Sequence, residues 1–419
     1  MVPHSLHLLY LVLSLPPGID THSFGTRGGP SVTRIGYGRA SRVARVYVLI
    51  TGIISCLGPT QTRSPIEGVI QMDLLRVGLV GYGFGSRVFH APLIRDLEGL
   101  AITGVFSPSQ ETRDRAEGEL RVPSHPSLEE LLGSEADLIV ISTPHHTHAE
   151  LAIQALRAGK HVVVDKVMCL TLEEADSMIA AAREGGRVLS VYQNRRWDGG
   201  FLTLRSLLDQ GSIGKPLRVE ARWLRGGGLS KRAAWRLDRT RGGGMWLDLG
   251  AHMVDQLLQI GGAVESVFAT QIFSEPDLNV PTHTKCHIGF KSGLQGLVET
   301  GALTPFPRPR WVALGTDGGW EKFGLDPQEE RLKQGVTGWP DDYDGPHGTL
   351  ALNEPDGDGV ETRETPTEPG DWRAFYVNVR DVIRGSAELA VKPEECREAL
   401  RVLLGAEESA REGQAVSLA

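Results

Sequence analysis

The stretch LRVGLVGYGFGS, residues 75–86, is an apolar run that ends in a glycine-rich turn. A short apolar run bounded by glycine is typical of a buried β-strand, and a helical pattern begins directly after Ser86. A glycine turn between a strand and a helix lets backbone N–H groups approach a pyrophosphate, whose charge the helix N-terminus then meets. Residues 75–86 therefore predict the first strand, turn and helix of a dinucleotide-binding domain.

Strands and helices alternate after this turn. Each expected strand is a nearly continuous apolar run, which indicates a parallel sheet that helices cover on both faces. The pattern predicts strands at 101–106, 136–142 and 161–164, and helices at 110–119 and 149–158. We therefore expect an N-terminal Rossmann domain, a doubly wound parallel sheet, over residues 72–192.

The pattern changes to longer, alternating strands after Tyr192. Alternation with period two is typical of a sheet with one covered and one open face. Residues 193–419 thus predict a C-terminal α/β domain on a mainly antiparallel, open-faced sheet, so the fold class is α/β plus α+β. This domain would bind substrate, and its open face invites pairing into a homo-oligomer, a dimer or tetramer. Its expected elements are strands at 217–223, 264–273, 283–290 and 294–300, a surface loop with one short hairpin at 338–370, and a helix at 393–411 that packs back on the body.

The composition is that of a globular protein with a small-molecule partner. The 419 residues are 40% hydrophobic, enough for two cored domains, and carry a formal net charge of -8. This charge argues against a nucleic-acid or anionic-membrane surface, since both need a concentrated positive field. The cysteines lie far apart without a C-x-x-C pair, which favours reduced thiols and a cytoplasmic protein. They are Cys56, Cys169, Cys286 and Cys396.

Residues 1–71 differ in composition from the rest. They contain no lysine and two acids against six arginines. The apolar run 6–15 resembles a signal-peptide core, but no basic residue precedes it. The run 46–57 is shorter than the roughly 20 residues of a membrane span. We expect a disordered leader or a misplaced start codon, because the segment lacks sustained periodicity, and function should survive its removal.

The glycine turn supplies the expected cofactor contacts. Gly81 and Gly83 occupy the first two positions of the G-x-G-x-x-G fingerprint, and Ser86, a small residue, stands at the third. Phe84 and Gly85 complete the turn. We expect all five residues to bind the dinucleotide.

The end of the second strand bears on the choice between NAD and NADP. NAD-preferring sites place Asp or Glu there to bind the ribose 2'-hydroxyl, but this chain has Ser107 and Ser109. No carboxylate repels a 2'-phosphate, and Arg113 follows within a helical turn. The expected cofactor is therefore NADP or NAD, with NADP favoured. The alternative is that Ser109 caps the following helix and Arg113 is solvated.

Three segments carry candidate reactive side chains. Lys166 follows the strand 161–164, at the carboxyl end where ligands bind in open α/β sheets. Asp248 and His252 are four residues apart, which places both on one face of a helix. The polar cluster QNRRWD, residues 193–198, stands at the expected domain junction, a usual location for small-molecule sites.

Together these segments resemble the Gfo/Idh/MocA family of oxidoreductases. The resemblance runs from about Leu75 to the C-terminus. The subgroup that contains NADP-dependent scyllo-inositol dehydrogenases is the most similar one. This similarity rests on FHAPLI, residues 89–94, and on GTDGGWEKFGLDPQEE from Gly315. The motifs that carry the resemblance are GYGFGSRVFHAPLI from Gly81, TPHHTH from Thr143, AGKHVVVDK from Ala158, QNRRWD from Gln193 and DLGAHMVDQ from Asp248.

The resemblance implies roles for individual residues. Lys166 matches the lysine of the family's E-K-P motif, Asp248 and His252 match its D-x-x-x-H pair, and Arg196 matches an arginine that lines the active site. Two residues depart from the pattern. Val167 replaces the usual proline after the lysine, and Asp165 replaces the usual glutamate near the nicotinamide ribose.

The TPHHTH segment and a second pair of histidines raise the question of a metal. We expect Thr143, Pro144 and His148 to contact the cofactor, with His148 capping the helix or facing the nicotinamide. His145, His146 and His148 form one histidine group, and His283 with His287 form another. No cysteine or carboxylate nearby completes a ligand set, so we expect no metal.

The expected reaction moves a hydride between the nicotinamide and a secondary alcohol of a sugar, inositol or related polyol. His252 would act as general base on the hydroxyl, because imidazole titrates near neutrality. Lys166 would stabilise alkoxide charge, and Asp248 would bind a neighbouring hydroxyl. Two alternatives remain: an enzyme that keeps its cofactor for transient oxidation, of epimerase or glycosidase type, and a dinucleotide-sensing protein without turnover.

Overall fold

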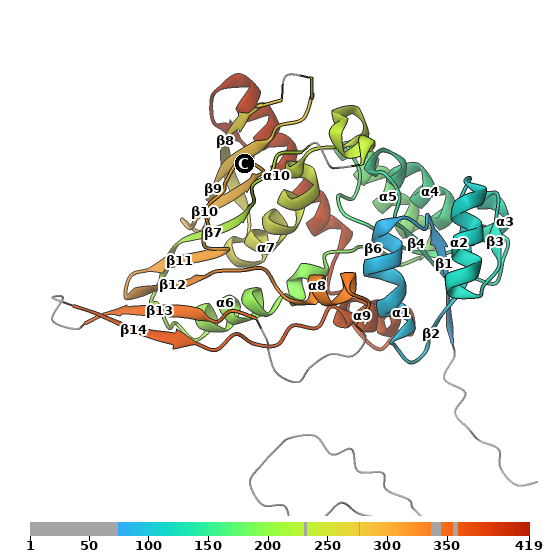
Figure 1. The fold of residues 1–419 in the computed structure, drawn as a ribbon, viewed down its shortest axis with the longest axis horizontal. Helices are drawn as coiled ribbons and strands as arrows, with labels where there is room; N and C mark the ends of the chain where they lie inside the picture. Colours follow the sequence, from blue (N-terminus) through green and yellow to red (C-terminus); the bar gives the residue numbers. More distant parts are fainter. Residues whose placement is uncertain (1–73, 230–232, 276, 337–344, 355–358) are drawn as a thin grey trace, which may run out of the picture. The chain divides into compact units, whose positions relative to one another are not determined.

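The computed structural model describes residues 74–229, 233–275, 277–336, 345–354 and 359–419 (Figure 1). The expected N-terminal extension, 1–71, lies outside the described residues. Two sheets organise the described part of the chain, and in Figure 1 the Rossmann sheet lies to the right and the second sheet to the left. None of the helices in these ranges combines the length and hydropathy of a membrane-crossing segment.

The first sheet has six parallel strands in the order β3-β2-β1-β4-β5-β6. This is the doubly wound order in which the strand sequence reverses next to β1, so a crevice opens there at the carboxyl ends of the strands. The strands are β1 (Leu75–Val80), β2 (Leu100–Phe106), β3 (Ser124–His125), β4 (Leu138–Ile141), β5 (His161–Val164) and β6 (Leu189–Val191). The covering helices are η1 (Ser86–His90), α1 (Ala91–Arg95), α2 (Gln110–Leu120), α3 (Leu128–Leu132), α4 (His148–Arg157) and α5 (Leu172–Gly185).

The second sheet has nine strands in the order β14-β13-β12-β11-β7-β10-β9-β8-β15. Its pairs are antiparallel except for β7 with β10. The strands are β7 (Pro216–Leu224), β8 (Val264–Ile272), β9 (His283–Phe290), β10 (Gln295–Gly301), β11 (Trp311–Gly315), β12 (Gly318–Lys322), β13 (Gly348–Asn353), β14 (Val360–Thr365) and β15 (Val416–Ser417).

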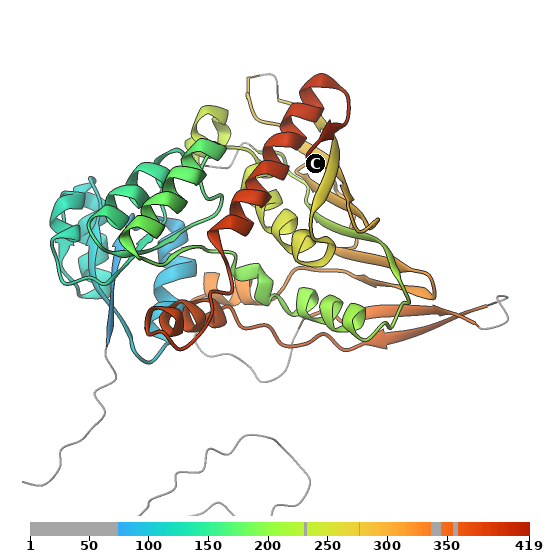
Figure 2. The same cartoon turned by 180° about the vertical axis from the view of Figure 1, so that it is seen from behind.

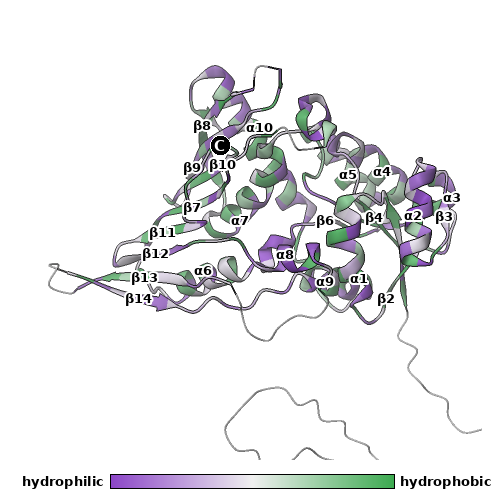
Figure 3. Ribbon diagram, in the orientation of Figure 1, coloured by the Kyte–Doolittle hydropathy of each residue, from purple (hydrophilic) through white to green (hydrophobic). Residues whose placement is uncertain are grey.

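Helices cover one face of the second sheet and connect it to the first. α7 (Ala251–Gly261) and α10 (Pro393–Glu412) pack on the sheet and on each other, and α10 also reaches α5, as Figure 2 shows from behind. Most of the buried apolar side chains form one continuous cluster that extends through both sheets, and a smaller second cluster contains Leu229, Met245, Val280 and Ala302. Figure 3 shows α7 as largely hydrophobic and α2 and α8 (Gln328–Lys333) as largely hydrophilic.

The segment after β14 returns to the first sheet. α9 (Arg373–Ile383) packs against α1, and the Tyr376 hydroxyl lies 2.6 Å from His90 Nδ1. Arg373 pairs with Asp96 at 2.9 Å. Burial of the large aromatic side chains Trp372 and Tyr376 in this contact is a main source of its stability, since each removes roughly 150–250 Å² from water.

The predicted fold class is confirmed. The β1, β5 and β9 predictions match the observed bounds, and β7, β8 and β10 differ from their predicted ranges by one residue at one or both ends. The short hairpin expected within the surface loop at 338–370 is present in its described part. β13 and β14 form a hairpin there that extends the second sheet, because β13 pairs with β12. Residues 337–344 and 355–358 of that loop lie outside the described residues.

Candidate active site

The glycine turn after β1 leaves room for a diphosphate. Gly81 has φ +86°, and a Cβ at this residue would lie 2.7 Å from the Ser142 carbonyl oxygen. A Cβ at Gly85 would lie 2.5 Å from Ser142 Oγ, whereas a Cβ at Gly83 would meet nothing within 4 Å. Glycine is therefore required at Gly81 by positive φ and close backbone approach, whereas at Gly85 a side chain would meet the Ser142 hydroxyl and at Gly83 it would enter open space. These residues fit a dinucleotide.

Ser86 closes the turn and does not face the ligand space. Its side chain is buried, and its hydroxyl donates to the Gly81 carbonyl oxygen at 2.6 Å. A small residue thus suffices at the third fingerprint position, as the sequence suggested. Ser86 supports cofactor binding through the shape of the turn.

A groove of about 540 Å³ begins at the glycine turn and runs along the carboxyl ends of β1, β2, β4 and β5. We call it the cofactor groove. It brings together most of the predicted cofactor residues, although they come from four separate segments. Those that line it are Gly81, Gly83, Phe84, Gly85, Ser107, Thr143, Pro144, Asp165 and Lys166.

The residues after β2 occupy different positions from those expected. Ser109 caps α2, since its hydroxyl accepts from Thr112 N at 3.3 Å. Arg113 donates to the Ser107 carbonyl oxygen at 2.7 Å and to Gln110. Neither Ser109 nor Arg113 lines the cofactor groove, whereas Ser107 does. The capping alternative is therefore what the structure shows for Ser109, and Arg113 is held by its neighbours instead of being solvated.

The prediction for His148 was wrong in its location. His148 is buried, does not cap α4, and lies 2.8 Å from the Val167 carbonyl oxygen and 3.0 Å from that of Thr143. It therefore ties the loop after β4 to the loop after β5 from behind. His145 lines the groove instead, with Nδ1 2.8 Å from the Gly242 carbonyl oxygen. Burial, with the charges of His148 and Lys166, lowers the pKa of His145 to about 3.

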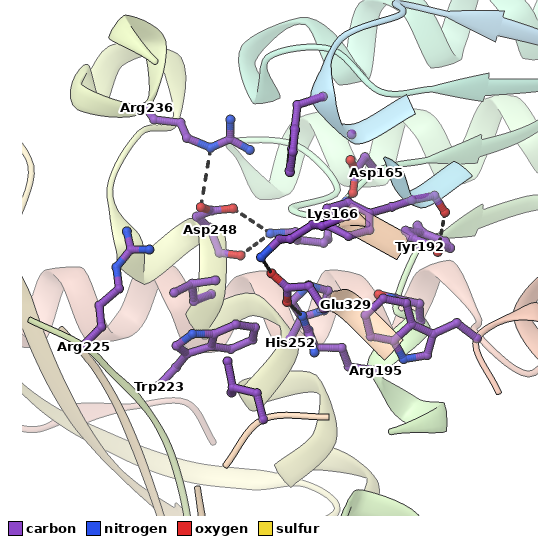
Figure 4. A pocket seen from close by; sticks show the side chains of 18 of the residues that line it. Asp165, Lys166, Tyr192, Arg195, Trp223, Arg225, Arg236, Asp248, His252 and Glu329 are labelled. Carbon is purple, nitrogen blue, oxygen red and sulfur yellow. Dashed lines mark hydrogen bonds and ion pairs between the residues drawn. The ribbon is translucent and has the colours of Figure 1, made fainter. Parts of the chain in front are cut away.

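A second pocket of about 480 Å³ adjoins the cofactor groove (Figure 4). We call it the catalytic pocket. The two spaces share six lining residues, so a ligand in one would touch a ligand in the other. The shared residues are Phe84, Gly85, Asp165, Lys166, Arg236 and Asp248.

Lys166 and Asp248 meet across these two spaces. Lys166 Nζ donates to Asp248 Oδ1 at 2.7 Å and also to the Asp248 carbonyl oxygen. Arg236 Nε lies 3.5 Å from the other oxygen of the same carboxylate. The residue after the lysine, Val167, is buried, and the peptide bond between them is cis. Lys166 is thus held by its ion pair with Asp248. Only 13% of each side chain is exposed, so solvent screens this pair weakly and the attraction between the charges is stronger than at the surface.

Asp248 and His252 lie at the start of one continuous helical segment. Asp248 belongs to the π-helical turn η6 (Trp246–Gly250), and His252 belongs to α7, which follows directly. Both side chains line the catalytic pocket, which agrees with the expected shared face. A π-helical turn widens the helix locally and is frequent at functional sites.

The surroundings of His252 set its proton state. Nδ1 lies 3.0 Å from Gln193 Oε1, so in this arrangement Nδ1 carries the proton and Nε2 has a free lone pair. Burial, followed by the positive charges of Lys166 and Arg195, lowers the pKa of His252 well below its ordinary value. The imidazole is therefore neutral near pH 7 and can accept a proton.

The prediction for Arg196 was wrong by one residue. Arg196 is buried away from both spaces and forms a bidentate pair with Asp255, at 2.8 and 2.6 Å, and a third contact with Glu395 at 2.8 Å. It joins α7 to α10 and has a structural role. Arg195 lines the catalytic pocket instead. Both arginines lie in the short helix η3 (Asn194–Trp197), where sequence alone does not indicate which one faces the pocket.

Asp165 is at the junction of the two spaces. Its Oδ2 accepts from Ser142 Oγ at 3.2 Å and lies 3.5 Å from His90 Nε2. Burial alone would raise the pKa of this carboxyl, but the His90 contact and the charge of Lys166 outweigh burial and lower it. Asp165 therefore remains an ionised acceptor.

Sequence analysis missed the residues that reach these spaces from distant segments. Aromatic spacing and charge alone gave no signal for them, because they come from helices, strands and loops far apart in the sequence that only the tertiary structure brings together. Those in the catalytic pocket are Phe89, Tyr192, Trp223, Arg225, Arg236, Glu329, Lys333 and Trp372, and those in the cofactor groove include Trp235 and Arg241.

The histidine groups do not gather ligands. His283 Nε2 contacts Glu299 at 3.1 Å on the second sheet, and His287 is exposed there. Among the described residues, no group of three or more His, Cys, Asp or Glu side chains is arranged to hold a metal ion.

A glycine turn on a Rossmann sheet, with a lysine, a carboxylate and a neutral imidazole in the adjoining pocket, defines the class of nicotinamide-dependent oxidoreductases. Two family models match the chain: the oxidoreductase family with NAD-binding Rossmann fold at residues 75–193, and the GFO/IDH/MocA C-terminal domain at 201–321. The chain belongs to the Gfo/Idh/MocA oxidoreductase family, as the sequence motifs indicated.

This chain aligns with nearly the whole length of several individual relatives. The uncharacterized oxidoreductase YdgJ of Escherichia coli is 37% identical over 83% of this chain and 99% of its own. The scyllo-inositol 2-dehydrogenase (NADP(+)) IolW of Bacillus subtilis is 31% identical over 84% and 98%. A solved oxidoreductase structure from Yersinia pestis is 34% identical with a TM-score of 0.76, over 83% of this chain and 98% of the other.

Proposed function

We propose that this protein is an NAD(P)-dependent dehydrogenase that oxidises a secondary alcohol of a sugar, an inositol or a related polyol, or reduces the corresponding ketone. One observation carries the proposal: Lys166, Asp248 and His252 line one pocket, and this pocket shares six residues with the groove at the glycine turn. A substrate carbon in the pocket would therefore lie beside a nicotinamide in the groove. The IolW relative is described as acting on scyllo-inositol, which supports this substrate class.

NADP is the cofactor that we propose over NAD. The groove at the end of β2 is lined by Phe106, Ser107, Pro108 and Thr112, and none of these is a carboxylate that would repel a 2'-phosphate. IolW is named as NADP-dependent, which supports the same choice. The bound nicotinamide would supply the hydride chemistry, and the protein residues would supply positioning and proton transfer.

His252 is the proposed general base in the direction of oxidation. Its neutral Nε2 accepts the hydroxyl proton of the substrate, and Gln193 holds the ring through Nδ1. The Lys166 ammonium donates a hydrogen bond to the same oxygen and stabilises its developing negative charge. Asp248 fixes the ammonium and accepts from a neighbouring substrate hydroxyl. In reduction these proton transfers reverse.

The direct test is a panel of sugars and cyclitols assayed with NADP and with NAD, following the absorbance of the reduced nicotinamide. We expect turnover of at least one neutral polyol, with NADP the better cofactor. Cofactor binding without turnover of any member, in either direction, would support the sensor alternative. Cofactor that stays bound through purification, without net reduction, would support transient oxidation.

We also propose a homo-oligomer that forms through the open face of the second sheet. Phe268, Ile272 and Leu314 expose 41%, 52% and 45% of their surface, and all three project from the face opposite α7. Exposed apolar groups of this size on one sheet face are typical of a contact surface.

The described cysteines Cys169, Cys286 and Cys396 are buried free thiols, which supports the proposed cytoplasmic location.

A further inference from the structure

The helix α8 forms one wall of the catalytic pocket and is firmly anchored. It begins within the segment LDPQEE, residues 325–330, which is part of a motif of the family resemblance but received no role from the sequence. Asp326 Oδ2 accepts from Gly199 N at 2.6 Å, at the start of α6 (Gly199–Asp209). Gln328 Oε1 accepts from Trp372 N at 2.7 Å, and its Nε2 donates to the Trp197 carbonyl oxygen at 3.1 Å. The position of α8 relative to the pocket is therefore fixed from both sides.

Glu329 is the residue of α8 that carries its carboxylate into the pocket. One oxygen contacts Arg195 NH2, and the other accepts from Lys333 Nζ at 2.6 Å. Arg195 is itself immobilised: its guanidinium lies 4.3 Å from the Trp223 ring centroid and 5.0 Å from that of Trp372. The carboxylate is thus oriented by two cations, and it keeps 17% of its side-chain surface exposed.

The carboxylate also remains ionised. Burial by itself would raise the pKa of Glu329, but the charges of Arg195 and Lys333 outweigh it and lower the pKa. Each carboxylate oxygen has two acceptor sites, so the contacts with Arg195 and Lys333 leave acceptor capacity toward the pocket. In Figure 4 the Glu329 side chain points into the same space as Lys166 and His252, from an element on the other side of the pocket. Trp223 also lines this pocket, with the Arg195 guanidinium over its ring.

We propose that Glu329 is a specificity-determining residue that accepts hydrogen bonds from adjacent hydroxyls of a neutral ring polyol, a cyclitol or pyranose, while the reacting carbinol of the same ring faces His252. This inference rests on the proposed function. It assigns Glu329 as the partner of the hydroxyls at the end of the substrate away from the carbinol on which the proposed base His252 would act. A ring with hydroxyls at its edge matches this carboxylate, and Trp223, whose ring Arg195 covers, forms part of the surrounding pocket wall. A carboxylate or phosphate at that edge would be repelled by Glu329.

The test compares Glu329→Gln with the wild-type protein on scyllo-inositol, myo-inositol and glucose. Glutamine keeps the shape and removes the charge. Glu330→Gln is the matched control, since Glu330 is the next residue on α8, is exposed and contacts Gln334 at 3.0 Å. We expect Glu329→Gln to raise KM about tenfold or more for the polyol that is turned over, with kcat within about threefold, and Glu330→Gln to change neither.

A deoxy analogue separates recognition from a general structural effect. Removing the substrate hydroxyl that meets Glu329 should raise the wild-type KM, and the Glu329→Gln substitution should then add little, because the two changes remove the same contact. Lys333→Met, which keeps Glu329 but removes one of its two cations, should raise KM less. Equal KM for wild type and Glu329→Gln on every polyol, or full additivity with every deoxy analogue, would overturn the proposal.

Binding measured without turnover distinguishes this inference from the proposed function. The shift in melting temperature with each polyol, in the presence of NADP, reports binding alone. Polyol binding that Glu329→Gln abolishes, without turnover by the wild type, would keep the Glu329 site and refute the dehydrogenase. Turnover that is insensitive to Glu329→Gln would keep the proposed dehydrogenase function and refute the role of Glu329. Neither binding nor turnover of any polyol by the wild type would refute both.

Discussion

The cofactor groove and the catalytic pocket differ in how the chain builds them. The groove is formed mainly by loops that directly follow β1, β2, β4 and β5, so its residues stand at regular places in the strand-helix alternation. The catalytic pocket takes side chains from η1, β7, η4 (Ala234–Leu237), α7, α8 and the start of α9, between residues 84 and 372. The groove therefore follows from local sequence rules, and the pocket follows from the packing of two sheets.

This difference separates common chemistry from substrate choice. A diphosphate needs backbone N–H groups and glycines, which any Rossmann turn supplies. A particular polyol needs side chains placed around it, and only the tertiary structure defines these. Substitutions in the groove should therefore change cofactor affinity, and those in the pocket should change turnover and substrate preference.

The largest expected effect is on catalysis in the pocket. His252→Ala removes the proposed base, and Lys166→Ala removes the donor to the reacting oxygen, so each should lower kcat about 10³-fold. Because neither residue belongs to the glycine turn, the dissociation constant for NADP should change less than about fivefold for His252→Ala. His287→Gln, an exposed histidine on the second sheet, is the control. Retained turnover in His252→Ala would show that another group moves the proton.

Substitutions at two glycines of the turn, Gly81 and Gly83, test the role of the cofactor groove. Gly81→Ala forces a Cβ toward the Ser142 carbonyl oxygen at positive φ, so it should destabilise the folded protein by about 1–3 kcal/mol. Gly83→Ala meets nothing in the protein, so its melting temperature should stay near that of the wild type. The new methyl group would nevertheless occupy ligand space and weaken NADP binding about tenfold or more. Unchanged NADP affinity in Gly83→Ala would mean that the diphosphate lies elsewhere.

Ser107→Asp tests the cofactor preference within the same groove. A carboxylate at the end of β2 would repel a 2'-phosphate and accept from a ribose 2'-hydroxyl, so kcat/KM should shift toward NAD by about tenfold to a hundredfold. Ser109→Asp is the control, because Ser109 caps α2 and does not line the groove. Equal kinetics with both cofactors before and after Ser107→Asp would refute the NADP assignment.

The sequence predicted most of the groove and the elements that carry it. Apolar runs and glycine positions depend on neighbours within a few residues, which is why β1, β5 and the turn were found. It did not resolve which of Arg195 and Arg196 faces the pocket, because one residue of rotation in η3 decides this and packing against Trp223, Trp372 and α7 sets that rotation.

His148 was misplaced for a similar reason. A histidine at the start of a helix beside the cofactor can face the ligand or the protein, and only the position of the Val167 carbonyl oxygen decides which. Glu329 lies in a motif of the family resemblance but received no role, since a single acid on a short polar helix is ordinary surface chemistry until tertiary structure brings it beside Arg195. The positions of Lys166, Asp248 and His252 in the sequence, supported by the family resemblance, predicted the set that the pocket brings together.

The smallest expected effect is on the pH dependence of stability. It comes from His145, the buried histidine that lines the cofactor groove and contacts Gly242. His145 has a folded-state pKa of about 3 against an ordinary value of 6.5, so below pH 6.5 the unfolded chain binds a proton that the folded chain does not. Its contribution to the free energy of unfolding is therefore unchanged above pH 6.5 and falls as pH decreases, by about 2 kcal/mol at pH 5. His145→Asn should reduce the loss of stability between pH 7 and pH 5 by this amount, as measured by urea unfolding. His146→Asn, at an exposed position on the same loop, should leave that loss as it is in the wild type. An identical pH dependence in His145→Asn would mean that His145 has nearly the same pKa in the folded protein as in the unfolded chain.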